Sequence, residues 1–201
     1  MKKKPVNLEE RALKLAGKGL LRARDAGKQG IPTVALTRLV AAGRLERIGR
    51  GVYAAPDAEI SPHRSLAEAA IRVPRGVVCL LSALRMHEIG VQQPSQVWLA
   101  LPHKLKQPRV EYPQLRIVRM SGPALTSGIE RRTVDGVSVP VFGAAKTVAD
   151  CFKYRNKIGT DVAVEALREG WRARKFKMED ISRYARICRV SNVMRPYLEA
   201  L

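Results

Sequence analysis

An amphipathic helix pattern followed at once by an arginine-rich hairpin pattern constrains the fold of this chain more than any other feature. Pro32 stands near the expected start of the helix and Gly43 just past its end, positions that these residue types favour. Leu36, Leu39 and Val40 recur at the spacing of one helix face and are expected to enter a core. The outward face then carries short polar side chains and one cation, namely Thr33, Thr37 and Arg38.

Residues 44–55 contain two short strand patterns on either side of a turn formed by Gly49, Arg50 and Gly51. The apolar side chains of these strands are expected to return to the core of the helices, and they are Leu45, Ile48, Val52 and Ala54. Arg44, Arg47 and Arg50 are expected to project from the hairpin. The hairpin is therefore predicted to be apolar on its inner side and strongly basic on its outer side.

Two further helices are expected before this segment. Asn7 is a suitable N-cap for a helix that runs to about Ala16, and a second short helix is expected near residues 20–26. Residues 27–30 then form a glycine turn before the third helix. Three helices in this order, followed by a basic hairpin, are typical of a winged helix-turn-helix domain, which the sequence places at residues 1–56.

The charge balance makes nucleic acid the first partner to consider. Lys and Arg number 37 against 18 Asp and Glu, a formal net charge of +19, and residues 1–56 hold 13 of the basic and 4 of the acidic side chains. We therefore expect double-stranded DNA to receive the third helix in its major groove while the hairpin contacts nearby phosphates. The candidates for base contacts are Thr33, Thr37 and Arg38, and those for phosphate contacts are Lys28, Arg44, Arg47 and Arg50.

Residues 57–201 are predicted to form a second domain of the α+β class. A change of composition at residues 55–62 indicates a linker, and strand patterns follow at residues 97–101, 115–120, 129–134 and 137–142. Asp135 and Gly136 form a two-residue hairpin signal between the last two strands. Helix patterns fill the chain from Ala144 onward and end in a short helix with Pro196 expected near its start. The sequence thus predicts a small, mainly antiparallel sheet followed by a helical C-terminal third.

Three segments of the chain resemble AbiEi-type antitoxins in the same order. Residues 39–53 (LVAAGRLERIGRGVY) are similar to the end of the N-terminal domain of that family. Residues 81–90 (LSALRMHEIG), with Pro94 and residues 97–100 (VWLA), look like its central segment. Residues 145–152 (AKTVADCF) and 163–168 (AVEALR) look like its C-terminal segment, so that the resemblance spans nearly the whole chain.

The resemblance implies a repressor that belongs to a type IV toxin–antitoxin operon. Such a protein is expected to bind inverted repeats upstream of its own operon through the winged helix. Its C-terminal domain is expected to counter a nucleotidyltransferase-like toxin without forming a stable complex with it. Two copies on repeated half-sites are a physically sensible route to specificity, because one small domain makes few base contacts.

Several other classes of protein are disfavoured by the sequence. Three widely spaced cysteines in apolar runs argue against a disulfide framework and for a cytosolic location. No apolar leader or span of about 20 apolar residues is apparent, so neither export nor membrane insertion is expected. No zinc spacing, phosphate-binding glycine loop or nuclease motif occurs, and Ser82 and His87 are too far apart around one helix to act together. We expect no cofactor, no metal and no enzyme activity.

Two basic clusters in the C-terminal third leave alternatives open. The first contains Lys146, Lys153, Arg155 and Lys157, and the second contains Arg172, Arg174, Lys175 and Lys177. A solvated helix surface explains each cluster, but together they also suit a larger DNA footprint, RNA or an acidic protein partner. An RNA-binding module and an antitoxin that blocks its toxin by direct contact are therefore the alternatives to the repressor.

Overall fold

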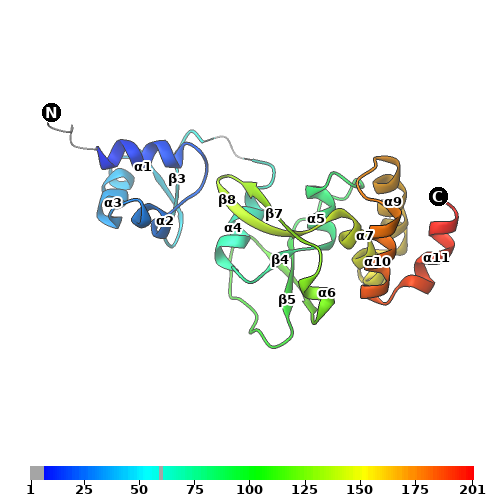
Figure 1. The fold of residues 1–201 in the computed structure, drawn as a ribbon. Helices are drawn as coiled ribbons and strands as arrows, with labels where there is room; N and C mark the ends of the chain where they lie inside the picture. The colour runs from blue at the N-terminus through cyan, green and yellow to red at the C-terminus, as the bar shows by residue number, and fades with distance from the viewer. Residues whose placement is uncertain (1–6, 59–60) are drawn as a thin grey trace. The chain divides into compact units, whose positions relative to one another are not determined.

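The computed structural model describes residues 7–58 and 61–201, and these fall into two compact units (Figure 1). The first unit contains the described chain up to Arg64 together with Thr133–Val137, and the second contains Ser65–Arg132 and Ser138–Leu201. The division into functional domains at residues 1–56 and 57–201 stays a prediction, because compactness alone assigns no function to either part. Within the described ranges, no helix has both the length and the apolar character needed to cross a membrane.

The first unit packs three helices with a three-stranded antiparallel sheet. Its elements in chain order are α1 (Leu8–Ala16), β1 (Leu21–Arg22), α2 (Ala23–Lys28), α3 (Thr33–Ala41), β2 (Glu46–Gly49) and β3 (Val52–Ala54). The strand order is β1-β3-β2, and Tyr53 pairs with Leu21 on one side and with Arg47 on the other. The helices and strands share one buried core, which comprises Ala12, Ala16, Leu21, Ala26, Ile31, Leu36, Leu39, Leu45 and Tyr53.

Local signals in the sequence set the ends of α1 and α3. The Asn7 side chain accepts hydrogen bonds from the backbone N–H groups of Glu9 and Glu10, at 3.2 and 3.4 Å, and so caps α1 as expected. Pro32 directly precedes α3, where its missing N–H group costs no helical hydrogen bond. Gly43 has a φ of 67° just after α3, a conformation that a side chain would strain.

The predicted hairpin is formed by β2 and β3. Gly51 has a φ of 68° in the turn, and the pairing register shifts between Arg47 and Gly49, which indicates a bulge. Because β3 also pairs with Leu21 and Arg22, the second helix begins only at Ala23 and not near residue 20 as the sequence predicted. The extended segment gains hydrogen bonds to a strand thirty residues away, which local periodicity does not reveal.

The second unit combines a five-stranded sheet with helices. The elements of this part of the chain are α4 (Arg64–Arg72), β4 (Val77–Val78), α5 (Leu80–Met86), β5 (Val97–Pro102), β6 (Leu115–Met120), α6 (Pro123–Thr126), β7 (Ile129–Val134), β8 (Val137–Phe142), α7 (Ala144–Lys153), α8 (Arg155–Ile158), α9 (Thr160–Arg172), α10 (Met178–Cys188) and α11 (Ser191–Glu199). The α+β class is therefore confirmed, because all five strands, with three helices before or between them, precede a helical C-terminal third (Figure 1).

The five-stranded sheet is mixed in direction. Its order is β6-β5-β4-β8-β7; β4 and β5 are antiparallel, whereas β4 pairs with β8 and β5 with β6 in parallel. The antiparallel pairing expected for this domain therefore holds for β4 with β5, and the two parallel pairs depart from it. Residues 103–114 supply the long crossover that a parallel β5–β6 pair requires.

The α7 helix lies in the main core of the second unit. Its residues from Ala144 to Phe152 are all buried, and it packs against α5, α9 and α10. A helix that is surrounded on all sides in this way has no face left for solvent. The predicted core positions of α7 and α10 join the same cluster, and they include Val148, Cys151, Phe152, Ile181, Ala185 and Cys188.

The closing helix differs from its prediction at Pro196. We expected this proline near the start of the helix, but α11 begins at Ser191 and Pro196 lies inside it. The helix starts earlier because the backbone N–H of Met194 already donates to the carbonyl of Val190, at 2.9 Å. Proline has no N–H, so the carbonyl four residues earlier, at Asn192, loses its usual helical partner.

Leu36→Ala should lower the free energy of unfolding of the first unit by about 2–5 kcal/mol, because it opens a cavity in a core where Leu36 is fully buried. Val34→Ala on the same helix is the matched control. Val34 is 61% exposed, and alanine is the better helix former, so this change should be neutral or slightly stabilising. Urea unfolding followed by circular dichroism measures both. Similar losses of unfolding free energy in the two variants would contradict the orientation of α3, in which Leu36 faces the core and Val34 faces solvent.

Candidate nucleic-acid interface

The outer face of α3 is open to solvent. Thr33, Thr37 and Arg38 are exposed, while Leu36 and Leu39 on the other face are buried. The Thr37 hydroxyl donates to the carbonyl of Thr33 at 3.1 Å, which leaves its lone pairs available to accept hydrogen bonds. Small side chains and one long cation are a combination that permits close approach of a helix to base edges.

Val34 is a further exposed side chain on α3 that was not predicted from the sequence. It lies four residues before Arg38, a spacing that places both side chains on neighbouring positions of one helix face. An exposed valine on a short helix offers methyl groups suited to contact with a thymine methyl. The i, i+4 spacing from Arg38 was the available signal, but apolar character alone favoured a core position.

No carboxylate lies on α3 or in the turns that flank it, and the first acidic residue after it is Glu46, which is exposed on β2 between Arg44 and Arg47. Residues 26–45 contain no Asp or Glu, a stretch that includes all of α3. Within residues 7–58 and 61–201, Arg38, Arg44 and Arg50 take part in no ion pair. These guanidinium groups therefore remain available to an external anion.

The hairpin contributes exposed arginines, as the sequence predicted. Arg44, Arg47 and Arg50 are exposed, and the Arg47 Nε group donates weakly to the Gly49 carbonyl, at 3.4 Å. Lys28, at the end of α2, is exposed as well. All candidate contacts thus reach solvent, and their roles toward DNA stay predictions.

Arg22 and Arg24 differ from the candidate arginines because Asp25 neutralises them in part. Both form ion pairs with Asp25, directly at the Arg22 Nε and at 3.7 Å from the Arg24 Nε. A paired guanidinium offers less net charge to a phosphate than a free one. The single acidic residue of α2 therefore neutralises part of the basic charge beside β1.

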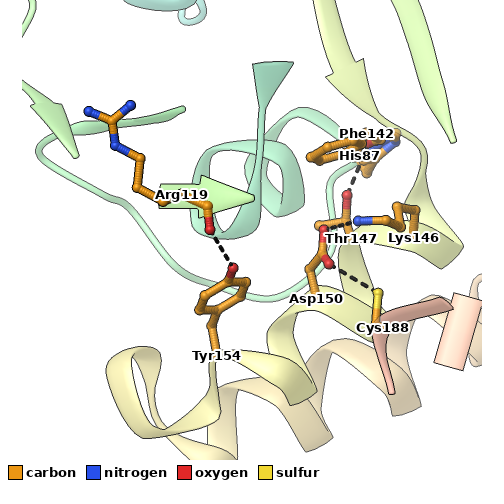
Figure 2. A network of polar contacts seen from close by, with 8 residues as sticks. All are labelled: His87, Arg119, Phe142, Lys146, Thr147, Asp150, Tyr154 and Cys188. Carbon is orange, nitrogen blue, oxygen red and sulfur yellow. Dashed lines mark hydrogen bonds and ion pairs between the residues drawn. The ribbon is translucent and has the colours of Figure 1, made fainter. Parts of the chain in front are cut away.

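The second unit contains a buried polar network that was not predicted from the sequence (Figure 2). Lys146 and Asp150 are both fully buried on α7, with the Lys146 Nζ 2.5 Å from Asp150 Oδ2. The Cys188 thiol of α10 donates to Asp150 Oδ1 at 3.2 Å, and the Lys146 Nζ lies 4.1 Å from the centre of the Phe142 ring. Lys146 is therefore not part of an exposed basic cluster, because its charge is paired inside the core.

This network ties α7 to α10. Burial raises the pKa of Asp150, against the opposing effect of Lys146. Burial, followed by the charge of Asp150, raises the pKa of the Cys188 thiol to about 12, so this thiol stays protonated at neutral pH. Tyr154, whose pKa burial also raises to about 12, donates its hydroxyl to the Arg119 carbonyl at 3.2 Å.

Ser82 and His87 have separate structural partners, as expected. The Ser82 hydroxyl accepts from the backbone N–H of Trp98 at 3.0 Å. His87 Nε2 lies 2.7 Å from the Phe142 carbonyl, and its Nδ1 lies 3.1 Å from an Arg132 nitrogen. A neutral ring protonated at Nε2 satisfies both contacts, since Nε2 donates and Nδ1 accepts.

A metal site finds no support in the part of the chain that the structure describes. No group of three or more His, Cys, Asp or Glu side chains is placed there to hold an ion. His63, His87 and His103 therefore form no such group with the cysteines.

Comparison with known proteins matches one segment of the first unit to a family model. Residues 10–56 match the family described as transcriptional regulator, AbiEi antitoxin, so the resemblance expected from the sequence is confirmed for this segment. The chain is also similar to the crystal structure of the RV2827C protein from Mycobacterium tuberculosis, with a TM-score of 0.56 and 15% identity, over 91% of this chain and 72% of that one. At that identity the likeness shows a shared fold. No curated protein matches the chain.

Lys146→Met or Asp150→Asn alone should lower the free energy of unfolding by roughly 3–5 kcal/mol, because each leaves one partner of a buried pair uncompensated. The double variant should lose less than the sum of the two single losses. Urea unfolding measures all three. The control is Arg183→Met, which breaks an exposed pair with Asp180 at 2.9 Å on α10 and should cost under about 1 kcal/mol. Additive losses in the double variant would show that the pair is not coupled.

Acidification should destabilise the chain through His87. Burial lowers the pKa of His87 below its ordinary value of 6.5, with a further lowering by Arg132. The unfolded chain therefore binds this proton first, so the contribution of His87 is full above pH 6.5 and declines as the pH falls toward the folded pKa. Urea unfolding from pH 8 to 5 should show a smaller decline for His87→Gln than for the wild type. Parallel curves would contradict this assignment.

Proposed function

We propose, taking as premise the match of residues 10–56 to AbiEi antitoxins that are transcriptional regulators, that this chain is a DNA-binding antitoxin that represses its own operon. The observation that carries the proposal is the solvent-exposed face of α3, which bears Thr33, Thr37 and Arg38 and is followed by the exposed arginines of the hairpin. The predominance of basic over acidic side chains in residues 1–56 supports a phosphate-rich partner.

The first unit is proposed to act as a winged helix-turn-helix. In this assignment α2 and α3 form the helix-turn-helix, α3 enters the major groove, and the β2–β3 hairpin is the wing. Thr33, Thr37 and Arg38 would read base edges. Lys28, Arg44, Arg47 and Arg50 would contact phosphates and hold the helix in register. Val34 adds an apolar contact to this set.

The operator is proposed to contain inverted repeats upstream of the operon. One domain of this size reaches few bases, so occupancy of two half-sites by two copies multiplies the discrimination that each copy supplies. Repression then follows from occupation of the promoter region. The type IV assignment and the location in the cytoplasm belong to the same proposal.

The second unit is proposed to counter a nucleotidyltransferase-like toxin without forming a stable complex with it. This part of the proposal comes from the family resemblance. Co-purification of the chain with the product of the neighbouring gene on a sizing column would instead favour direct blocking of the toxin.

Arg38→Ala should weaken binding to the operator about ten-fold while affecting a scrambled duplex much less, because a base contact carries sequence discrimination. Arg47→Ala should weaken binding to both duplexes and reduce the slope of log affinity against log salt by about one, because a phosphate contact releases counterions regardless of sequence. Gel-shift titrations of the full chain at several salt concentrations measure both effects.

Lys14→Ala is the matched control for these two variants. Lys14 is an exposed cation on α1 and is not among the proposed contacts, so its removal should leave the salt slope and the discrimination unchanged. Equal affinity of the wild-type chain for the operator and the scrambled duplex would overturn the repressor assignment and leave only a non-specific polycation.

A further inference from the structure

A cavity lies at the turn between α9 and α10, and the proposed function assigns no role to the residues that line it. It has a volume of about 630 Å³ and is lined by Trp171, Arg172, Arg174, Phe176, Lys177 and Met178. We propose that this Trp171 cavity binds an unstacked base and its phosphate from a single-stranded nucleic acid. Its volume lies within the range of ordinary ligand sites.

Trp171 supplies the surface on which a base would stack. It is the last but one residue of α9, and 36% of its surface is exposed although its neighbour Phe176 is buried. Stacking on an aromatic side chain is tolerant of sequence, because every base has two π faces. A partly exposed indole at the wall of a cavity is therefore suited to any unpaired base.

Three cations line the cavity together with Trp171 and are available to a phosphate. Arg172, Arg174 and Lys177 are exposed, and none of them takes part in an ion pair within the ranges 7–58 and 61–201. Lys175 differs, because its Nζ lies 3.4 Å from Glu88 Oε2 and it does not line this cavity. Of the four cations at this turn, Lys175 is therefore paired, and the three that line the cavity are available to a ligand.

Arg174 occupies a backbone conformation that normally selects glycine. Its φ is 52°, and it follows α9 in a tight turn in which the Lys175 N–H donates to the Gly170 carbonyl at 2.9 Å. An arginine here accepts backbone strain that glycine would avoid. Because the residue is arginine and not glycine, the cavity lining contains a guanidinium group in addition to the Trp171 ring.

The turn is held in one arrangement by close packing. A Cβ atom placed at Gly170 would lie only 2.4 Å from the Phe176 ring, so the ring sits directly against the α9 backbone. Phe176 is buried and belongs to the main core of the second unit. The cations are therefore presented from a packed turn, which reduces the ordering cost of binding.

A single strand fits these features better than the other polyanions do. In a duplex the base faces are already stacked on one another, so the indole would find no partner. An acidic peptide without aromatic residues, such as polyglutamate, would meet the three cations but would have no flat ring to place against Trp171. The combination of a ring and unpaired cations favours an exposed base with its phosphate.

Binding of fluorescently labelled RNA and DNA oligonucleotides of ten uridines or thymidines to the full chain tests this proposal by anisotropy. Trp171→Ala should weaken binding about ten-fold, whereas Trp171→Phe should keep most of it because a ring remains. Arg174→Gly should weaken binding several-fold through the loss of one phosphate contact, and glycine suits this backbone conformation, so the variant should fold. The RNA and DNA arms show which strand is preferred.

Arg189→Gly is the matched control. Arg189 also has a positive φ, 59°, just after α10, and it does not line the cavity, so the same change of charge and backbone should leave single-strand binding intact. Affinity for the duplex operator should be unchanged in Arg174→Gly. Wild-type affinity in both Trp171→Ala and Arg174→Gly would overturn the proposal, as would equally effective competition by a polyglutamate peptide.

Discussion

Burial of Leu36 and Leu39 fixes the rotation of α3, and the basic surface of the first unit depends on that rotation. Because each residue of a helix turns by about 100°, placing these two leucines in the core leaves Thr37 and Arg38 outside. The backbone N–H of Arg44 donates to the Leu39 carbonyl at 2.9 Å, so the start of the hairpin is joined to the end of the same helix. Burial of Leu39 thus fixes both the orientation of α3 and the point at which the hairpin begins.

Most of the first unit was predictable because its signals are local. The Asn7 cap, the stop at Gly43 and the turn at Gly51 each act within a few residues, and the structure contains all three. The leucine spacing likewise predicted which face of α3 is buried. The start of α2 was not predictable in this way, because Leu21 and Arg22 are extended by pairing with a strand far along the chain. The exposure of the candidate DNA contacts followed from the same local patterns.

The second unit was harder to predict because its organisation rests on contacts between distant segments. Strand patterns located β5 to β8, but pairing direction depends on crossover connections that composition does not specify. The sequence predicts a surface position for Lys146, as for most lysines, whereas its place in the core depends on Asp150 one helical turn later. A Lys and an Asp four residues apart within an apolar helix were the signal available. The cavity beside Trp171 forms only when α9 and α10 meet at a tight turn.

The placement of the cysteines gives the second unit a built-in chemical reporter. Cys79, Cys151 and Cys188 are all buried there, and residues 1–64 and 133–137 of the sequence contain no cysteine. Burial raises the pKa of all three thiols. While this unit is folded, an alkylating reagent therefore cannot reach the sulfur atoms, and the thiols are not in the reactive thiolate form. The increase in mass after alkylation therefore reports how often the second unit unfolds, independently of unfolding in the first unit.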